Sequence, residues 1–179
     1  DIVGDASPYY LSHPHAAQRA RDLVPDARIV CVLRDPVDRA FSHYRERVKQ
    51  GIETLLTFEA ALDAEHERTD GELERMVNEP SYVSWNHLNF GYAGQSRYGV
   101  SIERWVHHWP REQLLVLRSE DLYADPAGVL SRTRNFLGLA EVDDPATDDL
   151  HQNRLPSATI APQTRHRLWD ELSTDIESL

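Results

Sequence analysis

Apolar and polar positions follow two patterns along this chain of 179 residues. Short continuous apolar runs occur at 28–33 and 113–117, and such runs are typical of strands buried in a parallel sheet. Longer segments carry apolar residues at every third or fourth position, which is the period of an amphipathic helix. These segments predict helices over 15–23, 36–48, 57–66, 70–78, 95–109, 127–137 and 163–179. Strands and helices that alternate with short links favour an α/β fold with a parallel sheet and right-handed crossovers.

The junction between the first apolar run and the helix after it, 27–47, reads ARIVCVLRDPVDRAFSHYRER. The strand must end at Arg34-Asp35-Pro36, because proline cannot donate to a sheet ladder. Asp35 is a suitable N-cap, and Pro36 suits the first helical position. Arg34 is then at the carboxyl end of a strand, and Ser42 is two turns into the helix. Ligands of open α/β sheets bind outside these strand ends, and a guanidinium grips anions with a planar fork. The junction therefore predicts a phosphate site.

Several connecting segments lack a clear period. Residues 80–94, PSYVSWNHLNFGYAG, are aromatic and rich in amides, which predicts an irregular loop that is either a functional lid or a cover over core residues. Turns are expected at 5–9 and 121–126, where Asp, Ser and Pro gather. Gly138 is expected to end the helix at 127–137. Residues 1–3 are interpreted as the end of a strand.

Composition excludes several functions. About 40% of the residues are apolar, which is enough for the core of one domain, and the net charge of −11 argues against general binding to nucleic acid or acidic membranes. Cys31 is the only cysteine, so neither a disulfide nor a cysteine zinc site is expected. We expect instead a buried thiol in a protein of the reducing cytoplasm. No apolar run approaches the roughly 20 residues of a spanning helix, so we expect no membrane insertion. The histidines lack partners at ligand spacing, so no metal site is expected.

Four segments together resemble one protein family: LRDPVDRAFSHY, the helix from Tyr98 followed by PREQLLVL, then RSEDLYADP, and the helix that ends in FLGL. They are similar to the PAPS-dependent sulfotransferases (PAPS is 3′-phosphoadenosine 5′-phosphosulfate), especially the heparan-sulfate-type and bacterial branch. The resemblance runs from about residue 4 to the final helix. It implies a P-loop-like three-layer sandwich with a central parallel sheet flanked by helices. It also implies transfer of a sulfuryl group from PAPS to a hydroxyl or amine, without a metal.

The resemblance assigns roles to six residues. Arg34 and Ser42 are expected to hold the 3′-phosphate of the nucleotide. Tyr98 and Arg154 are further candidates for binding the nucleotide, and Asp5 and Glu46 are candidates for the general base that deprotonates the acceptor. The acceptor cleft is expected to include Trp85, His87 and Tyr92, whereas Trp105 and Trp109 are expected in the core.

Structural roles are the alternative for each of these residues. Arg34 would then form a surface salt bridge with Asp35 or Asp38. Ser42 would be a small residue at which its helix packs against its neighbours. Tyr98 would be a core residue, Arg154 a surface arginine, and the two carboxylates a cap and a solvated helix charge. The base would in that case come from elsewhere in the protein.

The chain departs from the family at the loop that holds the 5′-phosphosulfate, a glycine-containing turn with a lysine. Lys49 is the only lysine and follows Ser42, so it cannot belong to that loop. We therefore expect residues 1–179 to form a single sulfotransferase domain that lacks the N-terminal strand-loop-helix of this site. The alternatives are a non-catalytic binding module and a P-loop-type nucleotide kinase. The acceptor, a small molecule or a carbohydrate, cannot be identified, and neither can the oligomeric state.

Overall fold

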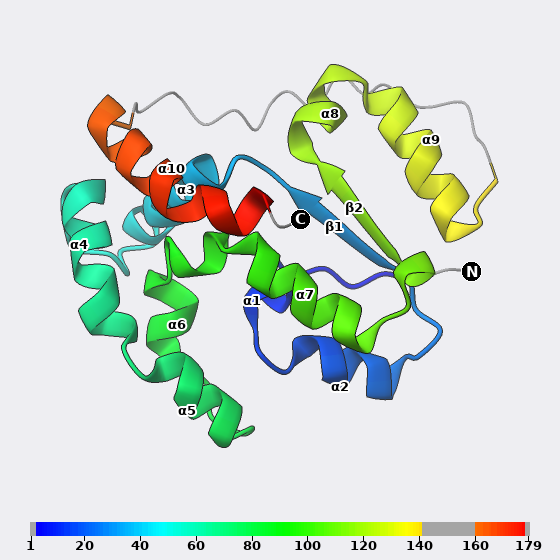
Figure 1. The fold of residues 1–179 in the computed structure, drawn as a ribbon, viewed down its shortest axis with the longest axis horizontal. Coiled ribbons are helices and arrows are strands. Elements are labelled where there is room, and N and C mark those ends of the chain that lie inside the picture. Colours follow the sequence, from blue (N-terminus) through cyan, green and yellow to red (C-terminus); the bar gives the residue numbers. More distant parts are fainter. Residues whose placement is uncertain (1–2, 141–159, 178–179) are drawn as a thin grey trace.

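The computed structural model describes residues 3–140 and 160–177 (Figure 1). Two strands, β1 (Ile29–Leu33) and β2 (Leu114–Arg118), pair in parallel, with Ile29 opposite Leu114 and Leu33 opposite Arg118. They lie side by side and point the same way, surrounded by helices (Figure 1). The predicted α/β class with a parallel sheet is confirmed, and both strands lie within one residue of the predicted runs.

Helices make up most of the described chain. They are α1 (Tyr9–Ser12), α2 (Ala16–Leu23), α3 (Pro36–Lys49), α4 (Phe58–Thr69), α5 (Glu72–Asn78), α6 (Trp85–Phe90), α7 (Tyr98–His108), α8 (Ser119–Ala124), α9 (Pro126–Leu137) and α10 (Pro162–Glu177). Two 3₁₀ turns, η1 (Gly94–Ser96) and η2 (Arg111–Gln113), precede α7 and β2. The last helix, α10, lies across α3 and α7, so the end of the chain packs beside the helix that follows β1 (Figure 1).

Three local predictions are wrong. The irregular loop at 80–94 contains α6, which Ser84 caps by accepting a hydrogen bond from the amide of His87 at 2.9 Å. The turn at 121–126 is occupied by α8, whose first turn carries acidic residues that favour a helix N-terminus. The helix expected over 95–109 begins only at Tyr98, because η1 precedes it. Short helices of this kind depend on tertiary contacts, which a period in the sequence does not report.

The two strands differ in burial. Leu114, Leu115 and Leu117 of β2 are buried, whereas Val32 of β1 is 53% exposed. Cys31, expected to be buried, is only partly so, and burial raises the pKa of its thiol to about 11. The first apolar run is therefore a half-buried strand in the described structure.

Two clusters form the core. One joins α3, α4 and α10 through Val37, Ala40, Tyr44, Phe58, Ala61, Tyr92, Ala93, Leu168 and Leu172. The other joins α2, α7 and β2 through Ala17, Trp105, Trp109 and Leu114. Trp105 and Trp109 are 5% and 2% exposed, which confirms their predicted place in the core.

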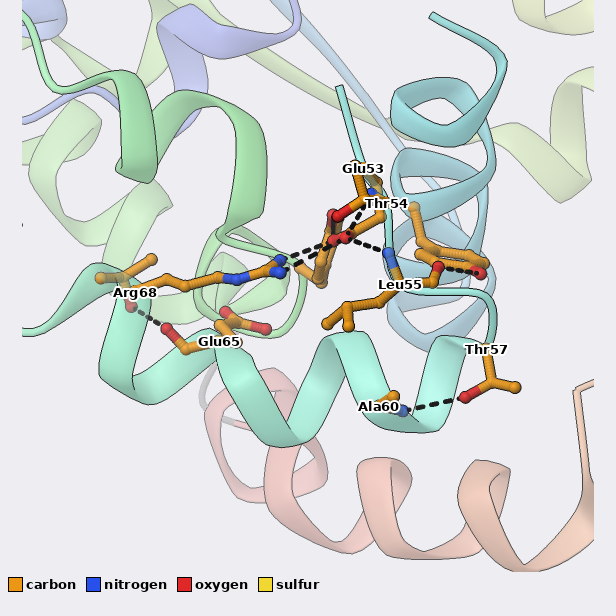
Figure 2. A network of polar contacts seen from close by, with 10 residues as sticks. Glu53, Thr54, Leu55, Thr57, Ala60, Glu65 and Arg68 are labelled. Atoms are coloured by element: carbon orange, nitrogen blue, oxygen red, sulfur yellow. Dashed lines mark hydrogen bonds and ion pairs between the residues drawn. The ribbon is translucent and has the colours of Figure 1, made fainter. Parts of the chain in front are cut away.

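A buried carboxylate ties the connection after α3 to α4 (Figure 2). Arg68 reaches from α4 to the Glu53 carboxylate at 2.6 Å, and the amides of Thr54 and Leu55 and the hydroxyl of Tyr92 each donate to it at 2.8 Å. Burial opposes ionisation of Glu53, but the hydrogen bonds outweigh it and lower its pKa. This network holds the segment after α3 against α4.

No helix among the described residues is long and apolar enough to cross a membrane.

Candidate functional site

The strand–helix junction has the predicted local geometry. Asp35 is the N-cap of α3, and its carboxylate accepts the amide of Asp38 at 2.8 Å. Pro36 occupies the first helical position, where the missing amide hydrogen costs nothing. The helix then runs for 14 residues, so Ser42 follows two turns after the cap. The local sequence alone is sufficient to place Arg34 at the carboxyl end of β1.

Arg34 is exposed, and among the described residues its guanidinium makes one weak contact, from Nη2 to the carbonyl oxygen of Arg39 at 3.5 Å. No described carboxylate forms an ion pair with it. The two nearest in sequence are engaged elsewhere: Arg165 of α10 pairs with Asp35 at 3.4 Å and also with Asp38. The alternative of a surface salt bridge from Arg34 to either aspartate is therefore wrong for the described residues, and the guanidinium is accessible to a ligand.

Ser42 is half-buried on α3, and no described residue forms a hydrogen bond with its hydroxyl. A free hydroxyl at this position is available as a donor to an anion. Within residues 3–140 and 160–177, the polar groups of both predicted phosphate-binding residues thus have no strong internal partner.

Tyr98 lies at the first position of α7 and is 4% exposed. It lies close enough to the junction for the backbone of Arg34 to lower the pKa of its hydroxyl. Burial raises the pKa of its hydroxyl, and the positive charges of Arg39 and Arg34 oppose that shift. The structure therefore brings Tyr98 and Arg34 together, and the tyrosine is also a core residue.

Arg39, the second arginine of the RDPVDR segment, links α3 to the segment between α6 and α7. Its Nε donates to Ser96 Oγ at 2.7 Å, and its Nη2 donates to the carbonyl oxygens of Gly91 and Tyr92. Burial lowers its pKa to about 10. Arg39 is a residue that reasoning from the sequence misses, and its spacing of one helical turn from Asp35 is the available signal.

With this geometry in view, the chain can be compared with known proteins. Residues 6–158 match the family model described as the sulfotransferase domain. The chain belongs to the sulfotransferase domain family. A crystal structure of a sulfotransferase from Alicyclobacillus acidocaldarius is similar to it, with a TM-score of 0.78 and 32% sequence identity, over 99% of this chain and 63% of that one.

Curated sulfotransferase relatives are similar at the same level. Human heparan sulfate glucosamine 3-O-sulfotransferase 3B1 is 30% identical over 141 residues, which cover 79% of this chain and 32% of the relative. Human bifunctional heparan sulfate N-deacetylase/N-sulfotransferase 3 is 30% identical over 140 residues, covering 78% of this chain and 15% of the relative. The chain thus spans about a third or less of the length of these curated relatives.

The candidate bases of this sulfotransferase domain lie apart from the junction contacts. Asp5 is exposed and accepts a hydrogen bond from the Tyr10 hydroxyl at 2.8 Å. Glu46 accepts one from the Gln50 side chain at 2.8 Å, within α3. Among the described residues, no hydrogen bond or ion pair joins either carboxylate to Arg34 or Ser42. Arg154 lies outside the described residues.

The residues expected in the acceptor cleft divide into three environments. Tyr92 is fully buried and donates to Glu53, so its interpretation as a cleft residue is wrong. Trp85 is 58% exposed at the start of α6. His87 lies 2.8 Å from the hydroxyl of Tyr9 through its Nδ1, and burial lowers its pKa to about 4. His87 is therefore neutral at physiological pH, held by a tyrosine from α1.

Two cavities lie away from Arg34 and Ser42. One, of about 400 Å³, lies between α4 and α10 and includes Glu65 and Arg167 in its lining. The other, of about 480 Å³, lies between the sheet and α7 and includes Cys31 in its lining. Neither Arg34 nor Ser42 lines either of these cavities.

Proposed function

We propose that this chain is the part of a PAPS-dependent sulfotransferase that binds the 3′-phosphate end of the donor. The enzyme moves the sulfuryl group of PAPS to a hydroxyl or amine of an acceptor and releases PAP (adenosine 3′,5′-bisphosphate). The observation that carries the proposal is Arg34: an exposed guanidinium without a carboxylate partner among the described residues, at a strand end, in a chain of the sulfotransferase family. The Ser42 hydroxyl adds a neutral donor to the same site.

The residues present fit a phosphate. A guanidinium binds phosphate oxygens through two parallel hydrogen bonds, and the serine hydroxyl supplies a third donor. The first turn of α3 adds the positive end of a helix dipole. The 3′-phosphate distinguishes PAPS from common adenine nucleotides, so this half of the site would provide the specificity for the donor.

The transfer itself breaks the bond between the sulfur and the bridging oxygen of the phosphosulfate, and it forms a bond between the sulfur and the acceptor oxygen or nitrogen. The electron pair of the broken bond stays on PAP, and the acceptor proton passes to a general base. By analogy with phosphoryl transfer, the protein mainly aligns the groups and stabilises spreading negative charge. Asp5 and Glu46 stay as candidates for the base.

The names of the curated relatives support a carbohydrate acceptor, because they describe heparan sulfate sulfotransferases. The net charge of −11 and the single lysine favour a smaller or neutral acceptor over a long acidic chain. A small-molecule or carbohydrate acceptor is therefore proposed, in a protein that works in the cytoplasm.

An acceptor screen with PAPS and the full-length protein tests this function. Release of PAP that depends on a neutral sugar or small alcohol supports the proposal. A protein that binds PAP but transfers to no acceptor is the non-catalytic binding module. A protein that binds ADP as tightly as PAP is closer to a nucleotide kinase, and that result contradicts the proposed function.

A further inference from the structure

Arg165 links the last described helix to the candidate phosphate site. Its Nη1 lies 3.4 Å from Asp35 Oδ1, and its Nη2 contacts Asp38 Oδ1. The two aspartates belong to the cap and first turn of α3, next to Arg34, and are 130 and 127 residues away from Arg165 in the sequence. One cation from α10 thus pairs with two carboxylates at the junction and offsets part of their negative charge.

These carboxylates would otherwise oppose binding of a phosphate in two ways. They would attract the guanidinium of Arg34, which is adjacent to Asp35 in the chain, and they would repel a dianion placed at the strand end. A third carboxylate is also near, because Glu120 accepts a hydrogen bond from the amide of Asp35 at 3.0 Å. With Arg165 in place, Arg34 makes no ion pair to any described residue.

We propose that Arg165 is a positioning residue for the 3′-phosphate of the nucleotide: it pairs with Asp35 and Asp38, offsets part of their charge and so keeps Arg34 available to the ligand. The inference rests on the proposed function. Arg165 need not touch the nucleotide, since its effect passes through the two aspartates. The site therefore combines residues from the strand–helix junction with one from the far end of the chain.

The fold should tolerate the loss of this side chain. The ion pairs of Arg165 are partly exposed, with 44% of its own side chain accessible, and pairs of this kind add little stability. Other polar contacts hold α10 in place: Arg97 to Glu171 at 2.8 Å, Thr164 to Glu59 at 2.7 Å, and Asp175 to the amide of Gly99 at 2.7 Å.

The chain offers a matched control on the same helix. Arg167 pairs with Asp63 of α4 at 3.0 Å, and its side chain is 56% exposed. Arg167→Ala removes the same charge from α10 but leaves the ion pairs of Asp35 and Asp38 with Arg165 intact. Comparison of Arg165→Ala with Arg167→Ala separates the local effect from the change in net charge.

The experiment measures the dissociation constants of PAP and ADP by isothermal titration with the full-length protein. We expect Arg165→Ala to weaken PAP binding by about tenfold, as the loss of a near-surface charge compensation implies, and to leave ADP binding within about twofold. Arg167→Ala should leave both unchanged. On the background Asp35→Asn/Asp38→Asn, which keeps a side chain able to cap α3, Arg165→Ala should have no further effect.

Several results would overturn the inference. PAP affinity in Arg165→Ala equal to that of the wild type refutes it, and so does an equal loss for ADP, which marks general damage to the fold. The same loss on the Asn/Asn background refutes it too, because Arg165 would then act directly rather than through the carboxylates. A wild type without a preference for PAP over ADP overturns the proposed function and this inference together, whereas a normal preference with an unaffected Arg165→Ala overturns the inference alone.

Discussion

Arg39 donates a hydrogen bond from Nε to the hydroxyl oxygen of Ser96 at 2.7 Å, and this contact joins α3 to the 3₁₀ turn before α7. Ser96 in turn contacts the carbonyl oxygen of Pro36 at 2.9 Å. The second arginine of the RDPVDR segment is therefore half-buried and hydrogen-bonded, whereas the first, Arg34, is exposed at the candidate site. Two arginines five positions apart in one motif thus have opposite environments.

We predict that Arg39→Ala destabilises the protein by about 2–4 kcal/mol, because it removes a charged donor to Ser96 and to the carbonyl groups of Gly91 and Tyr92, which are all buried. Arg39→Lys should restore little of this loss, because one ammonium cannot reproduce the planar fork. Urea unfolding measures the effect, and Lys49→Ala on the exposed end of α3 is the control. A loss below about 0.5 kcal/mol, the usual range of surface substitutions, would contradict the role of Arg39.

Stability should fall in mild acid because of His43. Its Nδ1 is buried and has no hydrogen-bond partner in the described structure. Burial, together with the charges of Arg39 and Arg47, lowers its pKa from 6.5 to about 3. Below about pH 6.5 the unfolded chain therefore binds a proton at this histidine, whereas the folded protein does not. The free energy of unfolding is thus highest above this pH and declines as the pH falls below it. His87, with its pKa lowered to about 4, acts in the same direction.

The test compares the free energy of unfolding at pH 7.5 and pH 5.5. Each of these histidines should contribute a loss of about 1–1.5 kcal/mol at the lower pH. His43→Phe keeps the ring contact with Tyr92, whose centroid is 5.1 Å away, and should remove about half of the loss. His166→Phe, at an exposed position of α10, should change nothing. An unaltered pH dependence in His43→Phe would contradict this account.

The N-terminus of α7 is capped from α10. The Asp175 carboxylate accepts the amides of Gly99 at 2.7 Å and Val100 at 3.1 Å, and α7 has no side-chain cap of its own. We predict that Asp175→Ala lowers the free energy of unfolding by about 1–2 kcal/mol, through loss of the cap and of its interaction with the helix dipole. Thermal denaturation measures the change, with Asp170→Ala on the same helix as the control. Equal melting temperatures for the two variants would refute the capping role.

The parts of the fold that depend on local sequence could be predicted. Pro36 and Asp35 fix the start of α3, and Gly138, with a φ of +72°, ends α9 in the left-handed conformation that glycine favours. These signals lie within a few residues of the feature they determine. The same holds for the position of Arg34 at the end of β1.

The parts that depend on distant contacts could not be predicted. No local pattern shows that Arg165 meets Asp38 or that Tyr98 is buried close to Arg34. The burial of Tyr92 likewise depends on Glu53, 39 positions earlier in the chain. The aromatic segment at 80–94 was therefore interpreted by composition, which does not separate core aromatic residues from exposed ones.

The central claim is that Arg34 and Ser42 bind the 3′-phosphate, and titration of Arg34→Ala with PAP tests it most directly. We expect binding to be abolished, and Ser42→Ala to weaken it by about tenfold, the typical value of one hydrogen bond to a charged group. The unfolding free energy of Arg34→Ala should stay within about 0.5 kcal/mol of the wild type, because the side chain is exposed and makes a single weak contact. A folded Arg34→Ala protein that binds PAP with unchanged affinity would contradict the account.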